Sequence, residues 1–224
     1  MEQLNLSIPK PEVKRQLGYQ EQTESNPQIE DLITEAITEA QTIIEPRGNY
    51  LRLENITISK DKVNLGTGQL TFVSQDIADL LANQDQVVIL AVTIGPALEE
   101  KVEQLFASDQ LTKATILDAV GSIAVEEAAN ELQEKIAAEA KEIALPSLTM
   151  RYSPGYGDLD LDIQPQLLEL VQGQELGVAV NDSFLLIPQK SITALIGLGQ
   201  TESKVQPQCD FDCANCDYDR CIYK

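Results

Sequence analysis

The sequence predicts an α+β fold, in which helices pack on a twisted and largely antiparallel sheet. Segments with strand and helix patterns follow one another without the regular alternation of parallel α/β folds. The unbroken apolar run over residues 87–94 is typical of a buried strand. The chain has 224 residues, which is enough for one sizeable core. We therefore expect a single domain over residues 1–199, followed by a tether and a short cysteine-rich tail over residues 200–224.

Helix and strand signals fill the first half of the chain. Residues 13–19 fit a short helix, and a longer helix is predicted from Pro27, with Asn26 as its N-cap and Pro46 beyond its end. Its apolar residues follow the helical period: Ile29, Leu32, Ile33, Ala36, Ile37, Ala40, Ile43 and Ile44. The next predicted elements are strands at 50–53, 56–58 and 63–65, of which the last continues the same sheet. They are followed by a helix that Ser74 caps and that ends near Asn83, by the strand 87–94, and by a helix after Gly95-Pro96.

A long helix dominates the second half and is predicted over about residues 109–144. Asp118, Ser122 and Glu126 are spaced four apart, so they share one face beside the buried stripe. Gly121 keeps this face low, which allows another backbone or a ligand to approach. The alternative is a solvated edge of an amphipathic helix. A short helix over 165–171 and closing strands over 177–180, 184–187 and 191–196 complete the predicted domain.

Composition excludes several classes of function. The chain has 16 Lys and Arg residues against 36 Asp and Glu residues, which gives a formal charge of −20. Nucleic acids and anionic membranes bind basic surfaces, so neither is an expected partner. There is no histidine, which rules out His-based catalysis and imidazole ligands from this chain. No leader and no apolar run of about 20 residues is apparent, so we expect a soluble cytoplasmic protein.

Two polar strings are candidates for a ligand site. In Arg151-Tyr-Ser-Pro-Gly-Tyr-Gly157, the Pro-Gly pair predicts a tight turn that presents Arg151 and Tyr156 towards one place. A planar cation beside an aromatic ring suits a small ligand with a carboxylate and a flat ring. The alternative is a connection whose Arg makes a surface ion pair. In the second string, Lys190 and Ser191 either donate to a ligand or form a hairpin corner with a solvated Lys.

The string RYSPGYGDLDLDIQPQLLELV, with IPQKSITALIGLG after it, resembles the activation domain of cobalamin-dependent methionine synthase, in a free-standing form. The resemblance implies binding of S-adenosylmethionine. In that family the motif Arg holds the ligand carboxylate, and the turn and its Tyr shape the pocket. By position, this implies Arg151, Ser153, Gly155 and Tyr156 as binding residues.

The resemblance is incomplete on the long helix. Ser122 stands where the family has a Glu that anchors the ligand, and Glu126 follows one turn later as the replacement candidate. The family's acidic contact near the N-terminus has no match. Lys190 is a further candidate for binding the ligand or a corrinoid side chain.

Four cysteines, Cys209, Cys213, Cys216 and Cys221, lie within one short run. Four clustered thiols on a soluble chain indicate a metal site, either zinc or an iron–sulfur cluster. Structural zinc sites usually pair two knuckles across a longer loop, so the single run favours iron–sulfur. The first three cysteines also match the CxxxCxxC of radical S-adenosylmethionine enzymes, but too few residues follow for the barrel that such enzymes need. Neighbouring aspartates would favour a low reduction potential.

The resemblance and the tail together predict a reactivation component, rather than a stand-alone catalyst, for a cobalamin-dependent methyltransferase. It would bind S-adenosylmethionine as methyl donor and relay an electron to cob(II)alamin carried by the partner. The family's activation domain receives electrons from a separate flavoprotein, and here the tail would be an internal relay. Two alternatives stay open. One is an iron–sulfur electron-transfer module that lacks methyl-donor binding, and the other is an interaction protein with a zinc-bound tail.

Overall fold

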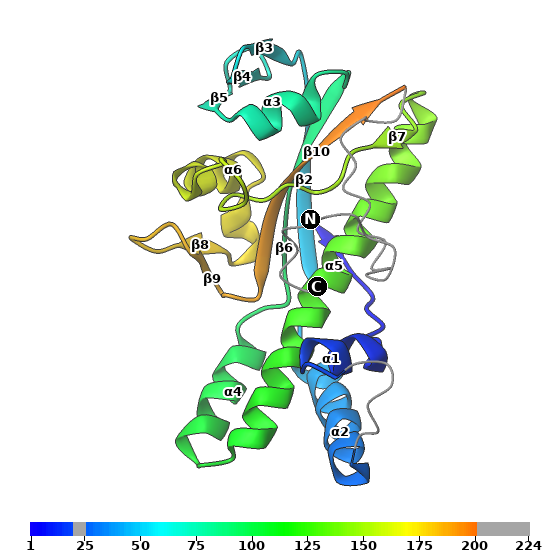
Figure 1. The fold of residues 1–224 in the computed structure, drawn as a ribbon, viewed down its shortest axis with the longest axis vertical. Coiled ribbons are helices and arrows are strands. Elements are labelled where there is room, and N and C mark those ends of the chain that lie inside the picture. Colours follow the sequence, from blue (N-terminus) through cyan, green and yellow to red (C-terminus); the bar gives the residue numbers. More distant parts are fainter. Residues whose placement is uncertain (20–25, 201–224) are drawn as a thin grey trace.

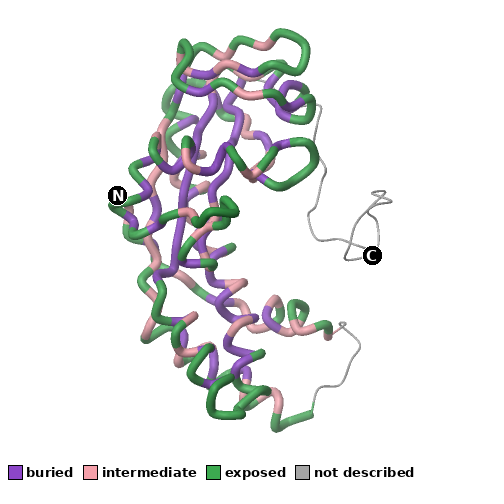
Figure 2. The backbone as a smooth tube through the Cα atoms, turned by 90° about the vertical axis from the view of Figure 1, so that its left-hand side faces the viewer, coloured by how far each residue is buried: buried purple, intermediate pink, exposed green. Residues whose placement is uncertain are grey.

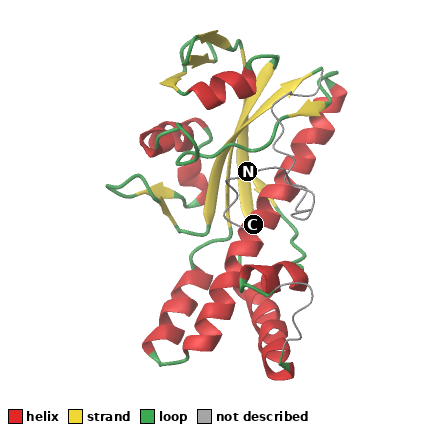
Figure 3. Cartoon of the chain, in the orientation of Figure 1, coloured by secondary structure: helices red, strands yellow, loops and turns green. Residues whose placement is uncertain are grey.

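The computed structural model describes residues 1–19 and 26–200, and it confirms the predicted α+β fold (Figure 1, Figure 3). Helices in this part of the chain are α1 (Lys10–Gln16), α2 (Pro27–Ile43), α3 (Gln75–Leu81), α4 (Ala97–Ala107), α5 (Leu111–Glu142) and α6 (Gln164–Leu170), with 3-10 turns at Leu161–Ile163 and Gly173–Leu176. The strands are β1 (Glu2–Gln3), β2 (Arg47–Glu54), β3 (Thr57–Ser59), β4 (Lys62–Leu65), β5 (Leu70–Val73), β6 (Gln86–Thr93), β7 (Ser147–Leu148), β8 (Ala179–Val180), β9 (Leu186–Ile187) and β10 (Ser191–Gly199).

The central sheet contains the strands in the order β1-β2-β6-β10-β7, and every neighbouring pair is antiparallel. β6 lies in the middle and pairs along its length with β2 on one side and β10 on the other. At its centre, Ala91 is opposite Asn49 of β2 and Thr193 of β10. The apolar run over 87–94 is therefore the central strand of the sheet.

The two faces of β6 belong to different cores, because successive side chains of a strand point to opposite sides. The even-numbered residues from Val88 to Val92 pack with α1, α2, α4 and α5. The odd-numbered residues from Val87 to Ala91 pack with α3, α6 and the strands near α3. Figure 2 shows the resulting band of buried residues through the sheet. Since helices or strands cover both faces, this strand has no polar alternation in its sequence.

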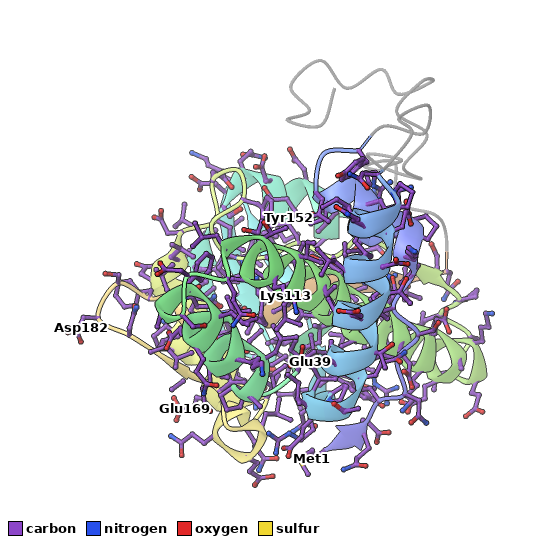
Figure 4. All side chains as sticks on the ribbon, turned by 90° about the horizontal axis from the view of Figure 1, so that it is seen from below. Met1, Glu39, Lys113, Tyr152, Glu169 and Asp182 are labelled. Carbon is purple, nitrogen blue, oxygen red and sulfur yellow. The ribbon has the colours of Figure 1, made fainter. Side chains whose placement is uncertain are left out.

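Two smaller sheets stand apart from the central one. β3, β4 and β5 form a three-stranded sheet, so the prediction that the strand at 63–65 continues the main sheet is wrong. The chain changes direction at Asn55, whose φ of 63° lies in the left-handed region that Asn tolerates. β8 and β9 form a separate hairpin, and of the predicted closing strands only β10 joins the central sheet. Figure 4 shows Asp182 at the outer tip of that hairpin, away from the helices that carry Glu39 and Lys113.

Both predicted N-caps are present. The Asn26 side chain accepts a hydrogen bond from the Gln28 N–H at 2.9 Å, and Ser74 Oγ accepts one from the Ile77 N–H at 3.0 Å. These bonds satisfy N–H groups that have no partner within the first turn. The first helix begins at Lys10, earlier than predicted, because a Pro in the first turn is compatible with a helix start.

Helix α5 runs almost the full length of the molecule (Figure 1). Its N-terminal half packs with α2 and α4 beyond the end of the sheet, and its C-terminal half lies against the sheet and β7. The described part of the chain bends into an arc (Figure 2). Within residues 1–19 and 26–200, no helix is both long and apolar enough to span a membrane.

Candidate functional site

The Arg151–Gly157 segment is attached to the central sheet at its beginning. The Tyr152 N–H donates to the Leu195 carbonyl at 3.0 Å, and the Leu195 N–H donates back at 2.9 Å. This antiparallel bridge lies on the β7 side of β10, where β7 itself has already ended. The motif therefore begins as a short continuation of the sheet edge. The bridge fixes the position of Arg151 along β10.

The rest of the segment forms the predicted tight turn. The Tyr156 N–H donates to the Ser153 carbonyl at 3.3 Å, with Pro154 and Gly155 at the two central positions. Gly155 has a φ of +90°, as the third position of a type II turn requires. A second pair of bonds closes the loop, from the Gly155 N–H to the Leu159 carbonyl at 2.7 Å and from the Leu159 N–H to the Tyr156 carbonyl at 3.0 Å.

The guanidinium of Arg151 lies against helix α5. Its Nη2 donates to Glu126 Oε2 at 3.1 Å, and its Nη1 donates to Asn130 Oδ1 at 2.9 Å and to Gln133 Oε1 at 3.0 Å. The structure thus brings together two of the predicted site residues, Arg151 and Glu126. The Arg151 side chain is 21% exposed and that of Glu126 is 57% exposed, so the pair is open to solvent on the Glu126 side.

These contacts leave hydrogen-bonding capacity on Arg151. A guanidinium has five N–H donors, and the bonds to α5 use both hydrogens of Nη1 and one of Nη2. Among the described residues, Nε and the second Nη2 hydrogen have no acceptor. The N–H groups on Nε and Nη2 are suited to donate hydrogen bonds to a carboxylate while the contacts to α5 are kept.

A second cation lies on the same face of α5. Lys190 Nζ lies 2.8 Å from Asp118 Oδ1 and donates to Ser122 Oγ at 2.9 Å, and its backbone N–H donates to Glu99 Oε1. Its side chain is only 15% exposed. Lys190 is therefore not the solvated residue of a hairpin corner, which was one of the two alternatives. As predicted, Asp118, Ser122 and Glu126 lie along one face.

Gly121 allows this close approach. A Cβ at this position would lie 2.6 Å from Leu98 Cδ2 and 3.3 Å from Lys190 Cε. Any larger residue would push Lys190 or the buried Leu98 away from α5. The low surface predicted at Gly121 is thus occupied by a neighbouring helix and by the Lys190 stem. Ser122 and Glu126 are one turn apart, about 6 Å along the axis.

The other predicted residues lie on the turn. Tyr156 is 68% exposed, Gly155 is exposed and Ser153 is half-buried. The Tyr156 ring therefore has a free surface, while the backbone that carries it is fixed by the hydrogen bonds of the turn. Arg151 and the turn are connected through the chain, whereas Lys190 reaches the same helix from the connection that precedes β10.

The sequence did not indicate that Asp158 is part of the motif's support. Its carboxylate accepts hydrogen bonds from Ser74 Oγ, from the Gln75 N–H at 2.7 Å and from the Asp76 N–H at 3.3 Å. It therefore caps α3 from another part of the chain. Slight burial acts to raise the pKa of Asp158, but the hydrogen bonds outweigh it and hold the pKa below its ordinary value.

The surroundings of Arg151 are acidic. Burial raises the pKa of Glu127 above its ordinary value. A hydrogen bond from Asn130 opposes this shift, the nearby Glu12 carboxylate adds to it, and Arg151 and Glu126 contribute smaller and opposite effects. The carboxyl groups of Glu126 and Glu127 thus both lie near the Arg151 guanidinium, an environment that favours a ligand with positive as well as negative charge.

The predicted metal ligands Cys209, Cys213, Cys216 and Cys221 lie outside the described residues. Within residues 1–19 and 26–200, no group of three or more His, Cys, Asp or Glu side chains is placed to hold a metal ion.

Comparison with known proteins gives a structural match and no sequence match. No protein-family model and no curated protein matches the chain. Among solved structures, the fold is similar to the crystal structure of the MetH reactivation domain bound to AdoHcy, that is, S-adenosylhomocysteine. The TM-score is 0.61 at 14% sequence identity, and the match covers 88% of this chain and 77% of that chain. At this identity the similarity establishes the fold.

Proposed function

We propose that this protein binds S-adenosylmethionine and takes part in the reductive reactivation of a cobalamin-dependent methyltransferase, as a methionine synthase-like reactivation component. The observation that carries the proposal is the contact between Arg151, from the Arg-x-x-Pro-Gly-Tyr motif, and Glu126 of α5. It occurs in a fold similar to a reactivation domain that was crystallised with S-adenosylhomocysteine.

The Arg151–Glu126 pair suits the amino-acid end of this ligand. That end carries a carboxylate and an ammonium group on one carbon. The remaining donors of Arg151 would bind the carboxylate, and the exposed carboxylate of Glu126 would bind the ammonium. Glu126 would thereby take the role of the family's anchoring Glu, at whose position this chain has Ser122. The acidic surroundings would also favour the positive sulfonium.

The turn would bind the other end of the ligand. The exposed ring of Tyr156 offers a flat apolar surface for the adenine. The Ser153 carbonyl and the Gly155 N–H are used within the loop, so a backbone contact to the ligand would come from the Ser153 N–H or the Gly155 carbonyl. Backbone contacts depend on the turn geometry rather than on side chains. Lys190 would act next to this pocket, where it could donate to the ligand or to an amide side chain of a docked corrinoid.

The cobalamin would arrive on another chain. This protein has no histidine, so it offers no imidazole to ligate cobalt. In the proposed reaction, cob(II)alamin gains one electron, and the resulting cob(I)alamin takes the methyl group from the sulfonium. The products are methylcobalamin and S-adenosylhomocysteine. This chain would bind and orient the methyl donor while the partner's cofactor does the chemistry.

The electron would come through the tail. Cys209, Cys213, Cys216 and Cys221 would ligate an iron–sulfur cluster, and zinc is the alternative metal. Zinc has no redox chemistry, so a zinc tail would mean an interaction role and an external electron donor. The second candidate function, an electron-transfer module without a methyl donor, is favoured by one observation, which is that Arg151 is already bound by three acceptors of α5.

The test is anaerobic reactivation of a cobalamin-binding methyltransferase. Reduced protein with S-adenosylmethionine should convert the partner's cob(II)alamin spectrum to that of methylcobalamin without added flavoprotein. Cys213→Ala should abolish conversion while the affinity for S-adenosylmethionine is unchanged. If Cys213→Ala reactivates as well as the wild type, the tail is not the electron route. No conversion under any reducing system would reject the reactivation function.

A further inference from the structure

The two ends of the loop that carries the proposed ligand contacts meet on one atom. Tyr152 Oη donates to Asp76 Oδ2 at 2.7 Å, and the Asp158 N–H donates to the same oxygen at 3.3 Å. Residues 153–157, which include the turn, lie between these two attachment points. Asp76 belongs to α3 and precedes Tyr152 by 76 positions in the sequence. Because α3 and α5 are different helices, this link is separate from the contacts between Arg151 and α5.

The link is reciprocal. The side chain of Asp158 accepts from the Asp76 N–H at 3.3 Å, while the side chain of Asp76 accepts from the Asp158 N–H at the same distance. Ser74 Oγ and the Gln75 N–H add two further donors to Asp158. We call Tyr152, Asp76 and Asp158 the loop clamp. Hydrogen bonds to an ionised carboxylate are stronger than those between neutral groups, so the clamp is a firm attachment.

Gly157 shows how closely the clamp fits the loop. A Cβ at this position would lie 1.9 Å from Asp76 Oδ2 and 2.1 Å from Tyr152 Oη. Its φ of +51° is also in the left-handed region. Any side chain at position 157 would therefore force apart the atoms that join the two ends of the loop.

Tyr156 depends on its backbone for its position. The residue is 68% exposed, so side-chain packing does little to hold the ring. The turn bonds at Ser153 and Gly155 set the local shape, but they do not fix the turn relative to α5 and Arg151. The loop clamp ties the turn to α3, and the backbone of Tyr152 ties it to β10, which in turn packs against α5.

We propose that Asp76 and Asp158 are positioning residues of the ligand site, which hold the turn in its binding geometry without touching the ligand themselves. The inference rests on the proposed function, since the ligand is the one assigned to Arg151 and Tyr156. Preorganised loops bind more tightly because less ordering is required on binding.

The test compares Asp76→Ala with Asp79→Ala. Asp79 lies on the same helix and is exposed, and among the described residues its side chain accepts a hydrogen bond only from the Gln75 side chain. We expect Asp76→Ala to weaken S-adenosylhomocysteine binding about tenfold, and Asp79→Ala to leave it within about twofold. Gly157→Ala, which keeps every clamp residue but separates them, should behave like Asp76→Ala.

Hydrogen exchange separates positioning from general loss of stability. In Asp76→Ala, the amides of Gly155 and Leu159 should exchange at least about tenfold faster, while those of β6 keep their wild-type rates. Equal affinity in wild type, Asp76→Ala and Gly157→Ala would overturn the proposal, as would an equal loss in Asp79→Ala. Faster exchange throughout the sheet would show that Asp76 supports the whole fold instead.

The outcome also distinguishes this inference from the proposed function. If the wild type does not bind S-adenosylhomocysteine, the proposed ligand is wrong, and the positioning role in binding that ligand is rejected with it. Exchange at Gly155 and Leu159 then still decides whether the clamp orders the loop. If the wild type binds and Asp76→Ala binds equally well, only the positioning role is rejected.

Discussion

The guanidinium of Arg151 lies 3.1 Å from the carboxylate of Glu126, although 25 positions separate the two residues. One comes from a loop after an edge strand and the other from the middle of the longest helix. The contact creates a pair of opposite charges that is partly open to solvent. Such a pair matches a zwitterionic ligand end better than either residue alone.

Substitution Glu126→Gln should weaken S-adenosylmethionine binding by about 1.5–3 kcal/mol, because the ligand ammonium loses a charged acceptor. The Gln side chain can still accept from Arg151, so the guanidinium stays in place. Titration calorimetry measures the effect. Methylthioadenosine, which lacks the amino-acid end, should bind both proteins equally, and a similar loss with that ligand would contradict the assignment of Glu126. Glu134→Gln, an exposed change on the same helix, is the control.

Protein prepared without oxygen should be brown and contain iron and acid-labile sulfide near cluster stoichiometry. Cys213→Ala or Cys216→Ala should bleach it, because each removes one of the four clustered thiolates. Metal analysis and the visible spectrum provide the measurement. A colourless protein that holds one zinc ion would exclude the redox role of the tail and favour the interaction protein.

The contribution of Asp158 to stability should disappear in acid. Its pKa is lower in the folded protein than its ordinary value, so its ionised form stabilises the fold above the unfolded-state pKa of about 3.9. This stabilisation is lost as the pH falls through the folded-state pKa. Urea unfolding of wild type and Asp158→Asn should show a difference that is constant from about pH 7 to pH 5 and shrinks below about pH 4. A difference that persists unchanged at about pH 3 would show that the carboxylate charge is not responsible.

Local patterns predicted most of the fold. Short-range preferences predict the caps at Asn26 and Ser74 and the extent of α5, because capping and helical periodicity depend on residues close together in the sequence. The separation of β3, β4 and β5 from the main sheet was missed, because strand pairing depends on contacts distant in sequence. The same holds for the candidate site, where the local features are predicted and the contacts between distant residues are not.

The sequence indicates the turn at Pro154-Gly155, and it indicates Arg151 and Glu126 as separate candidates for the ligand site. Their contact is a tertiary feature that no spacing encodes. Asp76 and Asp158 were missed for that reason, since 82 positions separate them. The only local signal in the sequence is that an acidic residue, Asp158, directly follows the motif. Nothing in the sequence places it beside the helix that Ser74 caps.

The central claim is that Arg151 binds the carboxylate of S-adenosylmethionine. Titration calorimetry of wild type, Arg151→Ala and the exposed control Arg52→Ala tests it directly. We predict that the wild type and Arg52→Ala bind equally, and that Arg151→Ala loses about 1.5–3 kcal/mol, or roughly 10- to 150-fold in affinity. Absence of binding by the wild type at millimolar ligand would contradict the claim and make the electron-transfer module the better account. Equal binding by wild type and Arg151→Ala would contradict the role of Arg151 while leaving methyl-donor binding in place.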